Sequence, residues 1–260
     1  RRGVIMRSSA MAVVAGLLLA SPLQAQMQVN NADIWLGPGH LVETFVVTNG
    51  GTETQQFTLE DADWDRSDDG TNRFFRPGTT PSSCERALEV FPRQMRIPAG
   101  GTQTVRVSLR PDSLPSRSCW SLVFVQSEPT ASPQTTVGVR YITRIGVKIY
   151  YTPSETVTLA EVVDFAQATK RTPADTAAVV LTVRNTGTKP IFTGGTVEIR
   201  RADNFVVAKV QVEAVPLLPA ATRAIRVTLP NLMPGSYVAL AVFDYGADED
   251  LAAQTPIVIQ

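Results

Sequence analysis

The side chains that could do covalent or acid–base chemistry are few in this sequence. It has one histidine, His40, in the glycine-rich stretch GPGHL, and two cysteines, Cys84 and Cys119. The sequence contains no nucleophile elbow, HExxH pair or phosphate-binding glycine loop. A lone histidine on a turn usually faces solvent. We therefore expect a protein that is not an enzyme and that uses no cofactor.

Acidic side chains gather in the stretch EDADWDRSDDG, and their spacing raises the question of a metal site. Asp65, Ser67, Asp69 and Gly70 match the beginning of a calcium-binding loop. The twelfth position of such a loop needs a bidentate glutamate, and here it is Arg76. A polar hairpin loop is therefore the expected structure, and we expect no metal.

The beginning of the sequence has the pattern of an export signal. Basic residues precede the apolar run AMAVVAGLLLA, and SPLQA offers small residues for cleavage after Ala25. We interpret residues 1–25 as a signal peptide. No later segment is long and apolar enough to cross a membrane. Lys and Arg number 24, as do Asp and Glu, so the overall charge favours neither nucleic acid nor an anionic membrane as a partner.

Export would place Cys84 and Cys119 in an oxidising compartment, where the two thiols can form a disulfide. The bond would close a loop over the 35 positions that separate them. For such a loop the chain-entropy argument gives a stabilisation of about 3 to 4 kcal/mol. Two unpaired cysteines in separate cores are the alternative.

Any binding site would have to be positioned by β-strands, because the sequence after residue 26 reads as short strands separated by turns. Turn-forming stretches such as NGG, SDDG, IPAGG and PDSLP separate them. The strand-like segments are LVETFVVTN, TQQFTLEDADW, ALEVFP, TQTVRVSLRP, CWSLVFVQSE and VGVRYITRIGVKIYYTP. Strands at this spacing predict an immunoglobulin-like sandwich.

A second group of strand-like segments follows, again with Pro-rich and Gly-rich connections. Its members are AAVVLTVRNTG, IFTGGTVEIRR, NFVVAKVQVEAV, TRAIRVTLP, GSYVALAVFDYG and TPIVIQ. We place the boundary near Pro153, which gives an all-β protein with domains at residues 26–153 and 154–260. VVTNGGTETQQF and TVRNTGTKPIF both read as a strand ending in Asn, a turn and a new strand. This echo favours two related sandwiches, although turns of this type are common in hairpins.

The segment VGVRYITRIGVKIYYTP, residues 137–153, has an alternating pattern of unusual length. Its odd positions up to Tyr151 are apolar apart from Thr143, and its even positions include Arg140, Arg144 and Lys148. For residues 145–151 we expect an interior strand with one face in the core. The part before it follows the Pro-rich and Ser-rich stretch SEPTASPQTT. An edge strand there would suit strand addition to another polypeptide.

Several of these motifs resemble the PapD-like periplasmic pilus-assembly chaperones. GVKIYYTP is similar to the end of that family's seventh strand, and VFPRQMRIPAGGTQTVRV is similar to an upstream stretch. RNTGTKPIF and FDYGA are similar to motifs of its second domain. The individual residues that match are Asn49, Trp64, Pro92, Arg96, Gly100 and Arg106. The resemblance covers nearly the whole mature chain and is stronger in the first domain than in the second.

The resemblance implies a boomerang of two immunoglobulin-like sandwiches in the periplasm, with pilus or fimbrial subunits bound in the cleft between them. It implies that the seventh strand completes the subunit's fold by donor-strand complementation, and that an outer-membrane usher then receives the subunit. Lys148 matches the family's cleft lysine, which holds the subunit's terminal carboxylate. Val137, Val139 and Tyr141 would place their side chains in the subunit's groove.

This sequence also departs from the family pattern. Asp33 stands where the family has a second cleft cation, and an acid beside Lys148 would oppose carboxylate binding. Arg144, four residues before Lys148 on the same strand face, could replace the missing charge or be an ordinary solvated arginine. The pair Cys84 and Cys119 is not the disulfide of the family's best-known branches. The alternative function is that of an exported two-domain adhesin or surface module, with a binding site at DRSDDGTNRFF.

Overall fold

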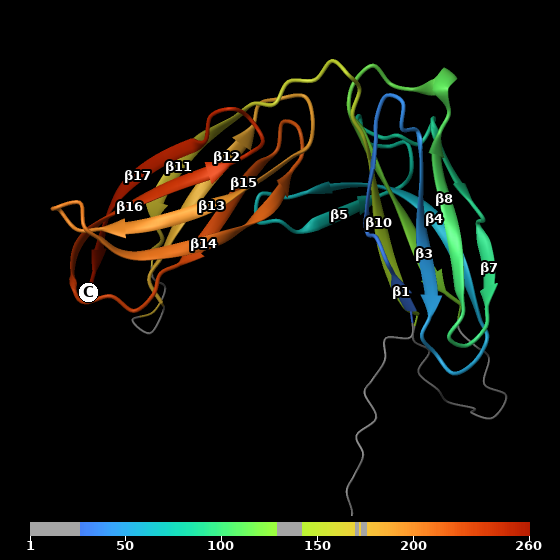
Figure 1. The fold of residues 1–260 in the computed structure, drawn as a ribbon, viewed down its shortest axis with the longest axis horizontal. Helices are drawn as coiled ribbons and strands as arrows, with labels where there is room; N and C mark the ends of the chain where they lie inside the picture. Colours follow the sequence, from blue (N-terminus) through green and yellow to red (C-terminus); the bar gives the residue numbers. More distant parts are fainter. Residues whose placement is uncertain (1–26, 129–141, 170–171, 173–175) are drawn as a thin grey trace, which may run out of the picture.

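The computed structural model describes residues 27–128, 142–169, 172 and 176–260 of the chain. The expected signal peptide, residues 1–25, lies outside them, as do Val137, Val139 and Tyr141. The described part is built from strands and one 3₁₀ turn, Pro111–Ser113. Figure 1 shows the strands gathered into two arms that meet at an angle. The predicted all-β fold, two immunoglobulin-like sandwiches in a boomerang, is confirmed. None of the described residues forms a helix able to span a membrane.

The first arm consists of two sheets that pack face to face. One sheet has the strand order β1 (Met27–Val29), β3 (Val42–Asn49), β8 (Thr102–Leu109) and β6 (Leu88–Phe91). The other has the order β2 (Asp33–Leu36), β10 (Arg144–Tyr151), β9 (Cys119–Ser127), β4 (Gln55–Arg66) and β5 (Asn72–Phe75), and β7 (Gln94–Ile97) pairs with the start of β4. Odd-numbered residues of β10 face the core between the sheets, as predicted for residues 145–151.

The second arm is also a sandwich of two sheets, one of three strands and one of four. Its smaller sheet has the order β11 (Ala160–Gln167), β12 (Ala178–Asn185) and β15 (Thr222–Thr228). Its larger sheet has the order β14 (Val206–Leu217), β13 (Ile191–Arg200), β16 (Gly235–Asp244) and β17 (Leu251–Ile259). Because β10 is the last strand of the first arm and β11 the first of the second, the chain crosses between the arms within residues 152–159.

Strand β9 is buried on both faces, which explains the nearly continuous apolar run CWSLVFV. Val123 and Val125 point into the core of the first arm. Trp120, Leu122 and Phe124 point to the opposite face, where they pack with other aromatic residues and with Leu218 of the second arm. The even-numbered face of this sheet is therefore an interface with the second arm.

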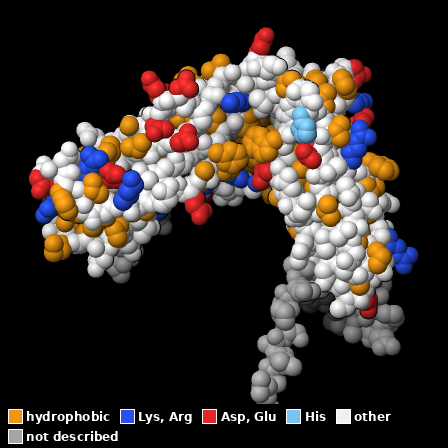
Figure 2. All heavy atoms as spheres, in the orientation of Figure 1, with side chains coloured by type: hydrophobic (Ala, Val, Ile, Leu, Met, Phe, Trp, Pro, Cys, Tyr) orange, Lys and Arg blue, Asp and Glu red, His pale blue; other side chains and the backbone are white. Residues whose placement is uncertain are grey.

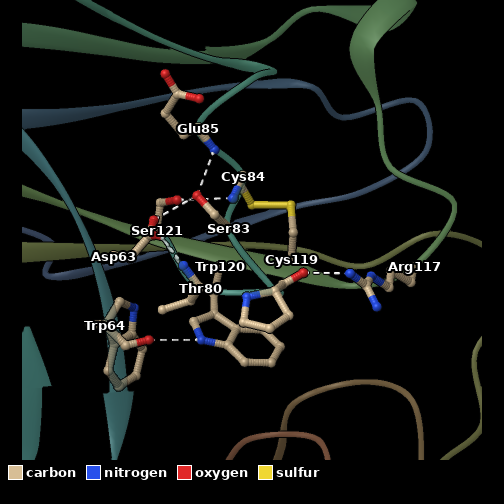
Figure 3. The surroundings of a disulfide bond; sticks show 11 residues. Asp63, Trp64, Thr80, Ser83, Cys84, Glu85, Arg117, Cys119, Trp120 and Ser121 are labelled. Carbon is tan, nitrogen blue, oxygen red and sulfur yellow. Dashed lines mark hydrogen bonds between the residues drawn. A yellow bond between two sulfur atoms is a disulfide. The ribbon is translucent and has the colours of Figure 1, made fainter. Parts of the chain in front are cut away.

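The predicted disulfide between Cys84 and Cys119 is present, and it fastens the connection between β5 and β6 to the start of β9. Figure 3 shows its surroundings, in which the fully buried carboxylate of Asp63 also holds this connection. Asp63 accepts hydrogen bonds from the Thr80 backbone N–H at 2.9 Å and from the Ser83 hydroxyl at 2.6 Å. The long connection is thus anchored to the sheet both covalently and through a buried acid.

Candidate functional site

Lys148 lies on the even-numbered face of β10, at the point where β2 begins. The two strands run parallel, and their register places Lys148 directly opposite Asp33. The Nζ atom of Lys148 is 3.8 Å from Oδ1 of Asp33 and 5.3 Å from the centroid of the Trp64 ring. The lysine side chain is only 19% exposed, whereas that of Asp33 is 43% exposed. The lysine is therefore more buried than the acid and lies against an aromatic ring.

Three aromatic side chains hold this charged pair in place. The hydroxyl of Tyr150 donates a hydrogen bond of 3.2 Å to Oδ1 of Asp33. Trp35 stacks on the Tyr150 ring at 4.1 Å between centroids, and Trp64 contacts the same ring edge-on at 5.9 Å. Burial raises the pKa of Tyr150, and the negative charge of Asp33 raises it further. Tyr150 therefore remains a hydrogen-bond donor to Asp33 at neutral pH.

The second arm contributes apolar side chains to the same region. Phe192 of β13 lies 5.6 Å from the Trp35 ring, and Leu218 packs against the aromatic face of the first arm. Trp35 and Phe192 are both partly exposed. Figure 2 shows hydrophobic side chains gathered on the concave side where the two arms meet. The Asp33–Lys148 pair is thus bordered by an accessible apolar surface at the junction.

The turn between β4 and β5 makes a separate contact with the second arm. Figure 1 shows β5 reaching from the first arm toward the second. The backbone N–H of Ala224 donates to the carbonyl of Asp68 at 3.0 Å, and the guanidinium of Arg223 lies against Gly70. Burial lowers the pKa of Arg223, and the positive charge of Arg66 adds to this effect. Sequence reasoning missed both arginines, because their proximity depends on how the arms meet.

The first half of β10 has an open edge. The backbone N–H of Lys148 donates to the carbonyl of Ala32, so the even-numbered N–H groups of β10 point toward β2. Pairing with β2 begins only at Lys148. Among the described residues, no strand pairs with residues 144–147 on that side, although β9 pairs with them on the other. The N–H groups of Arg144 and Gly146 therefore face a strand position that none of the described residues occupies.

Arg144 lies on the same face as Lys148, as predicted, but it has local partners. Its guanidinium is 2.9 Å from Oε2 of Glu60 and 3.5 Å from the centroid of the Phe124 ring. Four residues along a strand separate it from Lys148 by roughly 13 Å. Its suggested role as a replacement cation stays a prediction, as do the binding roles of Lys148, Val137, Val139 and Tyr141.

The other residues considered in the sequence have structural partners. His40 is exposed on its turn and lies 3.1 Å from Glu43. Asp65 binds Arg73, and Asp69 accepts hydrogen bonds from Ser67 and Thr71. No cluster able to hold a metal ion occurs among the described residues. The stretch suggested as an adhesin site forms the β4–β5 hairpin, whose turn packs against the second arm.

No protein-family model matches the chain, and no curated protein matches it in sequence. Solved structures with the same fold do exist. One is a chain of the chaperone–tip adhesin complex of CFA/I fimbriae biogenesis, with 13% identity, a TM-score of 0.52, and coverage of 89% of this chain and 98% of the other. Another is CfaA, a class 5 fimbriae chaperone, with 14% identity, a TM-score of 0.52, and coverage of 88% and 98%. The chain has the two-domain fold of the PapD-like fimbrial chaperones.

Proposed function

We propose that the protein is a periplasmic chaperone for pilus or fimbrial subunits, because it shares the fold of such chaperones. It would hold an incomplete β-sandwich subunit by adding its own strand to it, and would release the subunit to an outer-membrane usher. We propose that its two domains are residues 26–153 and 154–260. The observation that carries the proposal is the open edge of β10 beside the junction of the arms.

An open strand edge is a hazard for a soluble protein, because its unpaired N–H and carbonyl groups can recruit other chains. Strand addition uses the same groups productively, and it occurs in chaperone–pilin complexes. In the sequence, residues 144–147 directly follow the alternating segment 137–143. A subunit strand placed along this edge would find backbone donors and acceptors at the expected spacing.

The odd-numbered side chains of the segment support this reading. Val147 and Ile149 are fully buried in the core of the first arm, and Ile145 packs against that core. In the sequence, the alternation extends upstream through Tyr141, Val139 and Val137, with Thr143 as the polar interruption. One apolar row would thus begin in the chaperone's own core and continue into the groove of the subunit.

The test is co-purification with a fimbrial subunit encoded beside this chain. We expect Tyr141→Asp to abolish co-purification, because it would place a charge in an apolar groove. Ile142→Asp is the matched control, since Ile142 is 54% exposed and is the neighbour of Tyr141 in the sequence, so strand alternation would point it away from the odd-numbered row. It should retain most of the binding. Equal binding by both variants and the wild type would show that the odd-numbered row does not enter the partner.

A further inference from the structure

The charged pair Asp33–Lys148 has a property that a site for a carboxylate should lack. Its two charges lie 3.8 Å apart, so a ligand at a distance meets an almost neutral pair. The acid is the more exposed member, and the lysine is covered by Asp33 and by the ring of Trp64. A carboxylate that approached Lys148 from the cleft would be repelled by Asp33 about as strongly as the lysine attracted it.

The neighbouring cations, Arg144 and Arg66, have partners other than Asp33. Arg144 pairs with Glu60 further along the sheet. Arg66 contacts the Trp64 ring and donates to Asn72, and it lies close enough to Tyr150 to lower that residue's pKa slightly against the larger effect of burial. Among the described residues, Lys148 is the only cation whose ion pair with Asp33 the structure records.

The hydrogen-bonding capacity of the pair matches a different ligand. Asp33 is an acceptor with one oxygen already used by Tyr150, and Lys148 is a donor with three N–H groups. A peptide group carries one donor and one acceptor, so it can satisfy both residues at once. A carboxylate carries acceptors alone and offers no donor to the second oxygen of Asp33. The partly exposed rings of Trp35 and Phe192 offer contacts to the side chains beside such a peptide group.

We propose that Asp33 makes this site selective for an uncharged stretch of polypeptide backbone rather than for a free chain-terminal carboxylate. The inference rests on the proposed function, because the occupant is a segment of the bound subunit. Lys148 donates to a carbonyl of that segment, and Asp33 accepts from an N–H. The site therefore does not require the subunit to end at the cleft.

The experiment compares two forms of the co-encoded subunit, one with its natural C-terminus and one extended by Gly-Ser-Gly, which moves the carboxylate away. Affinities are measured by titration for the wild-type chain and for Asp33→Asn, which keeps the acceptor for Tyr150 but removes the negative charge. We expect the wild type to bind both subunits within about twofold. Asp33→Asn should prefer the natural subunit by about tenfold, the effect of one charged hydrogen bond.

Two further variants separate the possible failures. Asp33→Glu restores the charge and should remove the preference, which a merely structural role of Asp33 would not predict. Tyr141→Asp should weaken binding of both subunits equally, because it acts on strand addition. A wild-type preference of tenfold for the natural subunit, unchanged in Asp33→Asn, would overturn the selectivity. Failure of both subunits to bind the wild type would instead overturn the proposed function.

Discussion

Asn49 and Asn185 occupy the same place in the two sandwiches: each closes a strand, and each is fully buried. The side-chain amide of Asn49 donates to the carbonyl of Ile97 at 2.9 Å, and that of Asn185 donates to the carbonyl of Leu217 at 3.0 Å. Each carbonyl oxygen accepts from the N–H of a glycine two residues later. The similar stretches VVTNGGTETQQF and TVRNTGTKPIF therefore form the same structural element in the two arms.

Replacing either asparagine should destabilise its own arm. Asn49→Ala and Asn185→Ala each leave buried backbone groups unpaired, so we expect the free energy of unfolding to fall by about 2 to 3 kcal/mol. Denaturant titration measures the change. Asn30→Ala is the control, since Asn30 is exposed and accepts one hydrogen bond from Val46; it should cost less than about 1 kcal/mol. A similar cost for all three would contradict the role of burial.

Loss of the disulfide should weaken the first arm selectively. The bond joins residues 35 positions apart, so the double variant Cys84→Ala/Cys119→Ala should lose about 3 to 4 kcal/mol of unfolding free energy. Denaturant titration of oxidised wild type, reduced wild type and the variant checks this. The two samples without the bond should match. An unchanged midpoint on reduction would show that buried Asp63 alone holds the connection.

The β4–β5 turn should show an acid-sensitive interaction. The Ser67 hydroxyl, and next the Thr71 N–H, lower the pKa of Asp69 from 3.8 to about 2. Because the folded-state value is the lower one, the contribution to stability is present above about pH 4 and is lost as the pH falls toward 2. Ser67→Ala should raise the pKa of Asp69 in an NMR titration of its carboxyl carbon. Ser67→Thr keeps the hydroxyl and should preserve the low value.

The open edge of β10 predicts a contrast between two substitutions at one position. Arg144→Ala removes the ion pair with Glu60. Arg144→Pro removes this ion pair and also the backbone N–H on the side of β10 where no described strand pairs with residues 144–147. Proline is tolerated at an edge N–H, so both variants should fold. We expect Arg144→Pro to bind the subunit at least about tenfold more weakly than Arg144→Ala. Equal affinities in a pull-down titration would mean that this N–H is not used.

Tyr150 should resist ionisation at high pH. Burial and the charge of Asp33 both raise the pKa of its hydroxyl. Alkaline absorbance titrations of the wild type and of Tyr150→Phe should therefore coincide up to about pH 12. One additional phenol titrating near pH 10 in the wild type would show that Tyr150 is more accessible than its position between Trp35 and Trp64 indicates.

The strands with strict alternation were predictable from the sequence, because one of their faces meets a core. β3 and β8 are examples. β5 and β7 were not predicted because four residues carry too little periodicity, and β11 because its alternation is broken by a bulge between Val162 and Asp164. Their pairing is decided by neighbours far away in the sequence.

The candidate site was predictable only in part. Side chains alternate between the two faces of a strand, so the sequence places Lys148 and Arg144 on one face. The family resemblance places Asp33 beside Lys148, and the strand register confirms this. The partner of Arg144, Glu60, lies on a strand 84 positions earlier, which periodicity cannot indicate. The apolar run of β9 was predicted only as a strand, and the second arm that covers one of its faces could not be predicted from it.

Among the described residues, hydrogen bonds join the arms at two separate places, and Leu218 of the second arm also packs against the aromatic face of the first. One is the connection at residues 152–159, where Ser118 also donates to the carbonyl of Thr188, and the other is the backbone bond between Asp68 and Ala224. Hydrogen bonds at separate places, together with this packing, restrict the relative rotation of the arms more than the chain connection alone would. A polypeptide bound at the Asp33–Lys148 pair would therefore meet walls from both arms that these contacts keep aligned.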